Sequence, residues 1–185
     1  MSEMPKNPRI KDTEEYRKNV FLTGPRSAGK TTLLFRTLRN LRATYGGFVV
    51  KEIYEHGART GLVMIDLGTG ERGKLARYVD GKPRVNIEVF EGLGVRSVRR
   101  AVEGAPLVVL DELGRFEIEA PTFMEAVFDA LSSEVPVLGV LKAESNPFLD
   151  AIRRRSDVKL ITVNPSNRSV SKEILLRYLS YWYYP

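Results

Sequence analysis

Short apolar runs alternate along the chain with longer segments that repeat apolar residues at helical spacing, a pattern typical of an α/β fold with a mostly parallel sheet. The runs that predict buried strands are residues 19–23, 107–110, 137–141 and 159–163. The segments that predict helices are residues 32–43, 96–103, 122–131, 147–155 and 169–181. In the first of these helices Leu34, Leu38 and Leu41 share one face.

The middle of the chain breaks this alternation. The strands predicted there are residues 48–53, 62–67, 75–79 and 85–89. Residues 55–58 separate the first two, and the Asp80-Gly81 dipeptide, a common hairpin turn, separates the last two. Strands joined by such short turns pair antiparallel, so we expect a β-hairpin-rich insertion within the α/β body.

Two predicted helices begin with specific signals. Thr122 is followed three residues later by Glu125, which matches a capping box. Asn146 precedes Pro147, which is typical of a capping residue followed by a proline in the first turn.

Composition limits the class of protein. The 185 residues suit one domain, expected at residues 18–185 after a flexible tail at residues 1–17. The chain has no Cys and one His, which excludes disulfides and thiolate chemistry and leaves little room for a His-based metal centre. No apolar stretch approaches the roughly 20 residues that span a bilayer, so we expect a cytoplasmic protein without membrane contact. The net charge of +6 favours polyphosphate ligands and permits nucleic acid.

Residues 24–31 read Gly-Pro-Arg-Ser-Ala-Gly-Lys-Thr, the spacing of a phosphate-binding P-loop (Walker A motif), between a predicted strand and a predicted helix. Gly24 and Gly29 let backbone N–H groups approach phosphates closely. We expect Lys30 to reach the β- and γ-phosphates and act in catalysis, and the Thr31 hydroxyl to ligate Mg²⁺. The residues expected to contact the nucleotide are Gly24, Pro25, Arg26, Ser27, Ala28, Gly29, Lys30, Thr31 and Thr32.

A second motif follows the apolar run 107–110, which ends in Asp111 and Glu112. Ligands gather at the carboxyl ends of parallel strands, so this is the Walker B position. We assign Mg²⁺ binding to Asp111 and orientation of the attacking water to Glu112. In nucleoside triphosphatases in which a Glu follows the Walker B Asp, one strand lies between the P-loop strand and the Walker B strand. Residues 137–141 are the candidate for that strand. Lys142 would then face the γ-phosphate or, equally well, begin an exposed loop.

With both motifs placed, the chain from about Asn19 to Tyr178 resembles the small P-loop nucleoside-triphosphatase family first described from thermophiles. The shared pattern is a Gly-Phe strand carrying a Glu, an Arg-x-Gly turn and an Asp-Glu-x-Gly-x-x-Glu segment. The matching residues are Gly47-Phe48 with Glu52, Arg59-Thr60-Gly61-Leu62, Gly70, Leu75-Ala76, Asp111-Glu112-Leu113-Gly114-Arg115-Phe116-Glu117-Ile118 and, more loosely, Asn164, Asn167 and Arg168. Departures are Tyr54 in place of an Arg, Ser169 in place of an Asp, and the absence of a Gly-x-Tyr around residues 86–90. The resemblance implies a RecA-like sheet and slow hydrolysis of several nucleoside triphosphates.

Three arginines are candidates for stabilising charge on the transferred phosphoryl group: Arg26, Arg115 and Arg168. Arg26 lies within the P-loop and Arg115 just beyond the Walker B motif, so they are candidate catalytic residues. The assignment of Arg168 depends on the resemblance, and Arg168 could instead contact the base. Glu117 could hold Arg115 or Lys30 in place. Each arginine could equally be a solvated surface residue.

Two other functions fit the same P-loop. A nucleotide, nucleoside or polynucleotide kinase would use the hairpin insertion as an acceptor pocket. A nucleotide-gated switch that binds nucleic acid could use three Arg clusters: Arg96, Arg99 and Arg100; residues 153–155; and Arg36 with Arg39. Solvated helix faces explain those clusters more simply, so nucleic acid is possible but not favoured. The preferred base and the oligomeric state stay open.

Overall fold

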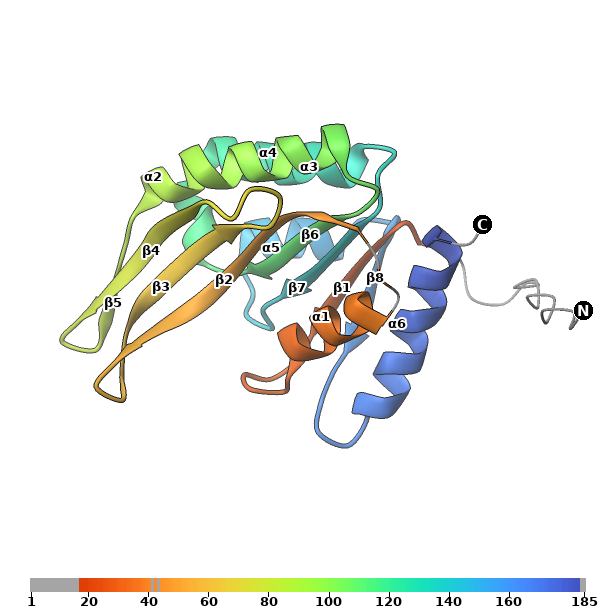
Figure 1. The fold of residues 1–185 in the computed structure, drawn as a ribbon, viewed down its shortest axis with the longest axis horizontal. Helices are drawn as coiled ribbons and strands as arrows, with labels where there is room; N and C mark the ends of the chain where they lie inside the picture. Colours follow the sequence, from red (N-terminus) through yellow and green to blue (C-terminus); the bar gives the residue numbers. More distant parts are fainter. Residues whose placement is uncertain (1–16, 41, 43, 184–185) are drawn as a thin grey trace, which may run out of the picture.

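The computed structural model describes residues 17–40, 42 and 44–183. Its centre is an eight-stranded sheet in the order β5-β4-β3-β2-β6-β7-β1-β8 (Figure 1). The strands are β1 (Asn19–Thr23), β2 (Gly46–Glu55), β3 (Ala58–Asp66), β4 (Arg72–Val79), β5 (Lys82–Val85), β6 (Val108–Leu113), β7 (Val137–Leu141) and β8 (Val158–Thr162). The predicted tail, apart from residue 17, lies outside the described residues, as does Leu41.

Strands β6, β7, β1 and β8 pair in parallel and form the parallel half of the sheet. Helices cover both of its faces: α1 (Lys30–Asn40) and α6 (Arg168–Tyr183) on one, α4 (Pro121–Ser132) and α5 (Pro147–Arg153) on the other. Burial on both faces explains why its strands read as continuous apolar runs. Because β7 separates β1 from β6, the predicted RecA-like order is confirmed.

The predicted hairpin insertion is present, but it extends the main sheet. Strand β2 pairs in parallel with β6 on one side and antiparallel with β3 on the other, and β4 and β5 continue the antiparallel order. We call β2–β5 the hairpin extension. At its junction with β6, Gly47 has a φ of +104°, and a Cβ there would lie 2.0 Å from the carbonyl oxygen of Val109. Only glycine fits this close approach of two strands.

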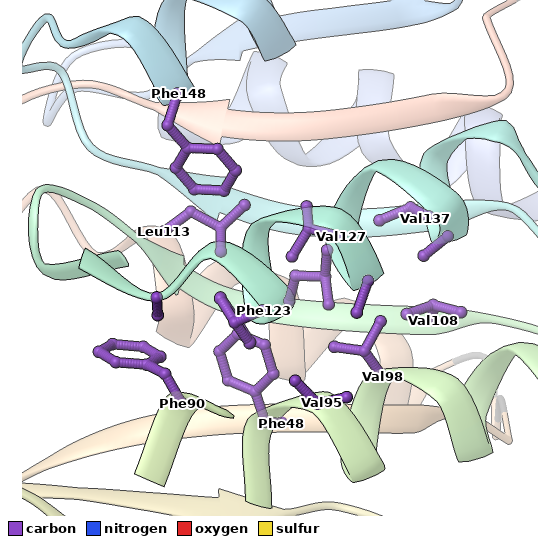
Figure 2. Packing of buried hydrophobic residues seen from close by; sticks show 14 of the residues in the cluster. Phe48, Phe90, Val95, Val98, Val108, Leu113, Phe123, Val127, Val137 and Phe148 are labelled. Carbon is purple, nitrogen blue, oxygen red and sulfur yellow. The ribbon is translucent and has the colours of Figure 1, made fainter. Parts of the chain in front are cut away.

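The strand predicted at residues 85–89 is wrong. β5 ends at Val85, and a continuous helical segment follows: α2 (Ile87–Val89), a π-helical turn (Phe90–Gly94) and α3 (Val95–Gly104). The Asn86 side chain accepts a hydrogen bond from the backbone N–H of Glu88 and so caps the segment. Phe90, 1% exposed, then packs against Phe123 of α4 with ring centroids 5.0 Å apart (Figure 2). Tertiary packing therefore decides a segment whose alternation alone predicts a strand.

The two predicted helix starts have different outcomes. Asn146 caps α5 as predicted, because its side chain accepts a hydrogen bond from the backbone N–H of Leu149. The capping box at Thr122 is wrong: α4 begins at Pro121, and the Thr122 N–H donates to the Glu91 carboxylate 3.0 Å away. The cap is thus supplied by a neighbouring helical segment.

Candidate functional site

The loop between β1 and α1 has the conformation that its glycines allow. Gly24 and Gly29 have φ values of +130° and +82°, and Ser27 also has a positive φ, of 61°. A Cβ on Gly24 would lie 2.2 Å from the carbonyl oxygen of Val163, just beyond β8. The close packing of this loop against the end of β8 therefore requires glycine.

Lys30 begins α1 and lies against the loop, with 8% of its surface exposed. Its ammonium group donates hydrogen bonds to the carbonyl oxygens of Gly24, at 3.0 Å, and Pro25, at 2.7 Å. Burial lowers the pKa of Lys30, while the carboxylates of Glu112 and Asp111 act in the opposite direction. A cation thus sits over the loop at the N-terminal end of a helix, where anions are favoured.

The next residue joins the two motifs. The Thr31 hydroxyl donates a hydrogen bond to Asp111 Oδ1 at 2.8 Å, which links the start of α1 to β6. Asp111 is fully buried, and its Oδ2 atom has no hydrogen-bond partner among the described residues. Burial raises the pKa of Asp111 to about 7, against the lowering effect of the Thr31 hydrogen bond. A buried carboxylate oxygen without a partner suits a hard cation.

Glu112 lies beside Asp111, half-buried, and pairs with Lys142 at the end of β7, where Glu112 Oε1 and Lys142 Nζ are 3.0 Å apart. The Lys142 ammonium also lies 5.6 Å from the centre of the Phe116 ring. The strand predicted to lie between the two motif strands, β7, therefore ends where Lys142 can contact Glu112. Of the two readings left open by the sequence, the structure supports the one that puts Lys142 beside the carboxylates.

The three candidate arginines take different positions. Arg26 is largely exposed and pairs with Glu52 at 3.2 Å. Arg115 is exposed and lies over the Phe116 ring, 5.3 Å from its centre, at the wall of the same pocket as Arg26. Arg168 donates a hydrogen bond to the carbonyl oxygen of Ala28 at 3.0 Å and packs against Gly29. Arg168 therefore supports the loop, whereas the other two face the pocket.

Glu117 is 3% exposed and lies in the pocket wall, where its Oε2 has no partner among the described residues. Burial raises its pKa to about 7, although backbone N–H groups of Gly114 and Glu117 favour the ionised form. The pairing with Arg115 or Lys30 suggested by the sequence is not found among the ion pairs of the described residues.

Apart from Asp111 and Arg168, these charged and hydroxyl side chains line one pocket of about 750 Å³. The pocket continues from the P-loop across the hairpin extension, where Val50, Leu62, Leu75, Tyr78 and Phe90 form an apolar end. At this end the Arg59 guanidinium lies over the Tyr78 ring, 4.5 Å from its centre, and Arg59 Nε is 2.9 Å from Glu52 Oε1.

Glu52 and Arg59 match the family pattern in the sequence, but that match alone assigns them no role in binding or catalysis. The alternation of β2 and β3 could have put them on one face, but not against the P-loop.

Comparison with known proteins gives a consistent result. The model of a family described as NTPase matches residues 19–176. A protein of Thermofilum pendens called nucleoside-triphosphatase THEP1 is 40% identical over 171 residues, which are 86% of this chain and 94% of that protein. The protein of that name from Thermotoga maritima is 38% identical over 163 residues, 84% of this chain and 92% of the relative.

Two solved structures share the fold. The solution structure of a human cancer-related nucleoside triphosphatase has a TM-score of 0.74 at 29% identity and covers 88% of this chain and 97% of its own. The crystal structure of THEP1 from Aquifex aeolicus has a TM-score of 0.74 at 26% identity and covers 87% of this chain and 98% of its own.

Proposed function

This chain belongs to the NTPase family, whose relatives are named nucleoside-triphosphatases, and we propose that the pocket above residues 24–32 is where it hydrolyses nucleoside triphosphates. The triphosphate would lie along the P-loop, with Lys30 against the β- and γ-phosphates. The observation that carries this assignment is the contact of 2.8 Å between Thr31 and Asp111, because it brings the phosphate loop and the carboxylate strand to one point.

The residues present fit a magnesium ion. Thr31 and Asp111 would hold it, together with substrate oxygens, and the unpartnered Oδ2 of Asp111 offers a further acceptor. Such a donor set suits Mg²⁺, which is commonly bound through one or two carboxylates and substrate phosphates. Among the described residues there is no group of three or more His, Cys, Asp or Glu that could hold another metal. Bound Mg²⁺ would neutralise charge on the β- and γ-phosphates.

Glu112 is the residue that we propose to act on water. It adjoins the Mg²⁺ ligand Asp111 and opens into the pocket, so its carboxylate can orient a water molecule towards the γ-phosphate and accept its proton. Lys142 holds the carboxylate in place through their 3.0 Å contact, and its ammonium is available to the γ-phosphate oxygens. Arg115 and Arg26, both in the pocket wall, would add positive charge as the phosphoryl group is transferred. Arg168 would act on nucleotide binding through the P-loop carbonyl that it holds.

Phosphate release from ATP, GTP, CTP and UTP with Mg²⁺ tests this proposal. We expect Glu112→Gln to reduce turnover by about 100-fold or more, since positioned acid–base groups contribute 10²–10⁴-fold, while nucleotide still raises the melting temperature. Lys30→Ala should remove that nucleotide-dependent stabilisation. Glu119→Gln, an exposed acid near the site, is the matched control and should leave both properties unchanged. Full activity in Glu112→Gln would remove Glu112 from the mechanism.

The apolar end of the pocket favours a second candidate function, transfer of the phosphoryl group to a hydroxyl acceptor. Val50, Leu62 and Leu75 line a region of the pocket beyond Glu112 that could hold an organic molecule. The acceptor oxygen would attack the γ-phosphorus, its proton would pass to Glu112, and the diphosphate would leave. Labelled phosphate appearing on an added nucleoside or oligonucleotide, rather than in solution, would support transfer.

The finer properties stay predictions. Slow turnover and broad base specificity follow from the resemblance, residues 18–185 are proposed as one domain, and the cytoplasm is the location proposed from the sequence. None of the helices in the described part of the chain is long and apolar enough to cross a membrane.

A further inference from the structure

One face of the hairpin extension gathers basic side chains. Residues directly opposite one another on paired strands share a face, and the register places Lys51, Val63 and Lys74 in one row. In the next rows Arg72 lies opposite Ile65, and Arg77 lies opposite Arg84. We call the cations of these rows, with the neighbouring Lys82, the basic sheet face: Lys51, Arg72, Lys74, Arg77, Lys82 and Arg84.

This face points away from the helices that cover the extension. A Cβ on Gly73 would lie 2.7 Å from Val89 of α2, so the side chains on either side of Gly73, Arg72 and Lys74, point to the opposite face. In Figure 1, α2, α3 and α4 lie along one side of β2–β5; on the other side α1 borders β2, where Phe35 and Arg39 line a pocket together with Val49 and Lys51. All members of the basic sheet face are exposed.

The charge of the basic sheet face is not neutralised within the described residues, since none of its cations forms an ion pair there. The acids of the same strands lie elsewhere: Glu52 lines the pocket, Asp66 pairs with Arg100 of α3 at 2.5 Å, and Glu55 adjoins the turn at the hairpin tip. Between the cations lie the half-buried side chains of Val63 and Ile65. A group of adjacent cations with no acidic side chain among them attracts a polyanion.

The Arg clusters that the sequence suggested for nucleic acid are different. Arg96 pairs with Glu71 at 2.8 Å and Arg100 with Asp66. Arg153 pairs with Asp150 at 2.6 Å, and Arg155 with Asp157 at 2.8 Å. Two of the three clusters are therefore largely neutralised. On the basic sheet face, by contrast, all six cations are unpaired among the described residues, and the sequence scatters them between apolar residues.

A groove of about 580 Å³ leads from the basic sheet face to the P-loop. Its lining includes Lys51, Arg39 and Thr31. The aromatic side chains of Phe35 and Tyr45 also line it, with ring centroids 6.1 Å apart. A positively charged groove with aromatic rings is the combination that binds single-stranded nucleic acid, because phosphates meet the cations and bases stack on the rings.

We propose that the basic sheet face and this groove bind single-stranded nucleic acid. Backbone phosphates lie along Arg72, Lys74 and the cations opposite them, and bases reach Phe35 and Tyr45. The occupant is a nucleic acid and not a membrane, because the apolar side chains of this face are half-buried between cations, and the half-buried rings of Phe35 and Tyr45 lie in a groove. Of the residues proposed for hydrolysis, only Thr31 also lines this groove.

The test is fluorescence anisotropy of a labelled single-stranded oligonucleotide with the full chain, across a series of KCl concentrations. The variant Lys74→Glu/Arg77→Glu/Arg84→Glu reverses three charges of the basic sheet face. Its matched control, Arg99→Glu/Arg154→Glu/Arg177→Glu, makes the same change in net charge at exposed positions on α3, after α5 and on α6. The corresponding Gln variants test loss of charge without reversal. Phosphate release without nucleic acid and the melting temperature establish that each variant is folded.

We expect binding by the wild type to weaken linearly with log salt, and the variant on the basic sheet face to bind at least 10-fold more weakly, with a salt slope reduced by about 2. The control should lose less than 3-fold. Equal losses in both variants, or no binding by the wild type at 50 mM KCl, would overturn the proposal. So would binding to vesicles of anionic lipid that depends on the same residues while the oligonucleotide is not bound. Basal phosphate release is expected to be unchanged in all variants, so failure here leaves the hydrolytic assignment intact.

Discussion

The parallel half and the hairpin extension belong to one sheet, but their side chains are buried to different extents. In β1 the side chains of Val20, Phe21 and Leu22 are all 0% exposed, because helices cover both faces. In β2 the buried Phe48 packs in the core with side chains of α3 and α4, whereas Lys51 lies exposed on the opposite face. The proposed hydrolytic residues lie at the strand ends of the parallel half. The hairpin extension supplies the pocket's apolar end and the basic sheet face. The proposed chemistry thus lies where packing on both faces fixes the backbone, and the proposed recognition lies where one face of the sheet carries exposed cations.

The largest expected effect tests whether the two regions share one core. Phe123 of α4 is 0% exposed and contacts Phe48 of β2, with ring centroids 5.6 Å apart, as well as Phe90 (Figure 2). We expect Phe123→Ala to lower the free energy of unfolding by about 4 kcal/mol, because it leaves a cavity between α4 and β2. Urea denaturation measures this loss. The control Ile53→Ala, at a half-buried position of the extension, should cost about 1 kcal/mol, and equal losses would contradict the comparison.

The next largest loss of stability is expected at the junction of the two regions. At Gly47 a Cβ would meet the backbone of β6, whereas at Gly57, in the hairpin turn, φ is +80° and no atom lies within 4 Å. Gly47→Ala should therefore cost about 3 kcal/mol or more, and Gly57→Ala about 1 kcal/mol from backbone conformation alone. Chemical denaturation of the two variants side by side checks the difference. A small loss at Gly47 would show that β2 can separate from β6 without cost.

The smallest effect concerns the pocket between the regions and depends on pH. Glu117 has a pKa raised by burial from 4.5 to about 7, so the folded protein binds more protons than the unfolded chain between these values. The stability that protonation provides is lost as the pH rises through this window, up to about 3 kcal/mol. Glu117→Gln should therefore raise the melting temperature by about 5 °C at pH 8 and change it little at pH 5. Glu119→Gln is the exposed control, and an effect of equal size at both pH values would refute a role for ionised Glu117.

The parallel half was largely predictable from the sequence, for a physical reason. Its strands are buried on both faces, so a run such as residues 137–141 leaves one interpretation once helices flank it. The P-loop spacing then predicted a phosphate site, and the position of Asp111 at a strand end predicted carboxylates beside it. The structure confirms their meeting through the contact of Thr31 with Asp111.

The extension was less predictable because local pattern and tertiary packing compete there. Residues 85–89 alternate like a strand, but the Asn86 cap and the burial of Phe90 make a helix of their second part. Neither the pairing of β2 with β6 nor the contact of Glu52 with Arg26 can be derived from spacing, since both depend on strand order. For the same reason charge density along the chain pointed to Arg clusters on helices, while the basic sheet face forms only after four strands align.

The position of β1 has a consequence for the timing of synthesis. Although β1 comes first among the strands, it pairs only with β7 and β8, which come last in the sheet by sequence. A ribosome-bound chain that has emerged only as far as β6 therefore carries the complete phosphate-loop sequence without the neighbours that hold its strand. Nucleotide binding by a folded P-loop therefore requires synthesis to have passed β8, so the nucleotide cannot assist the folding of the segments that emerge earlier.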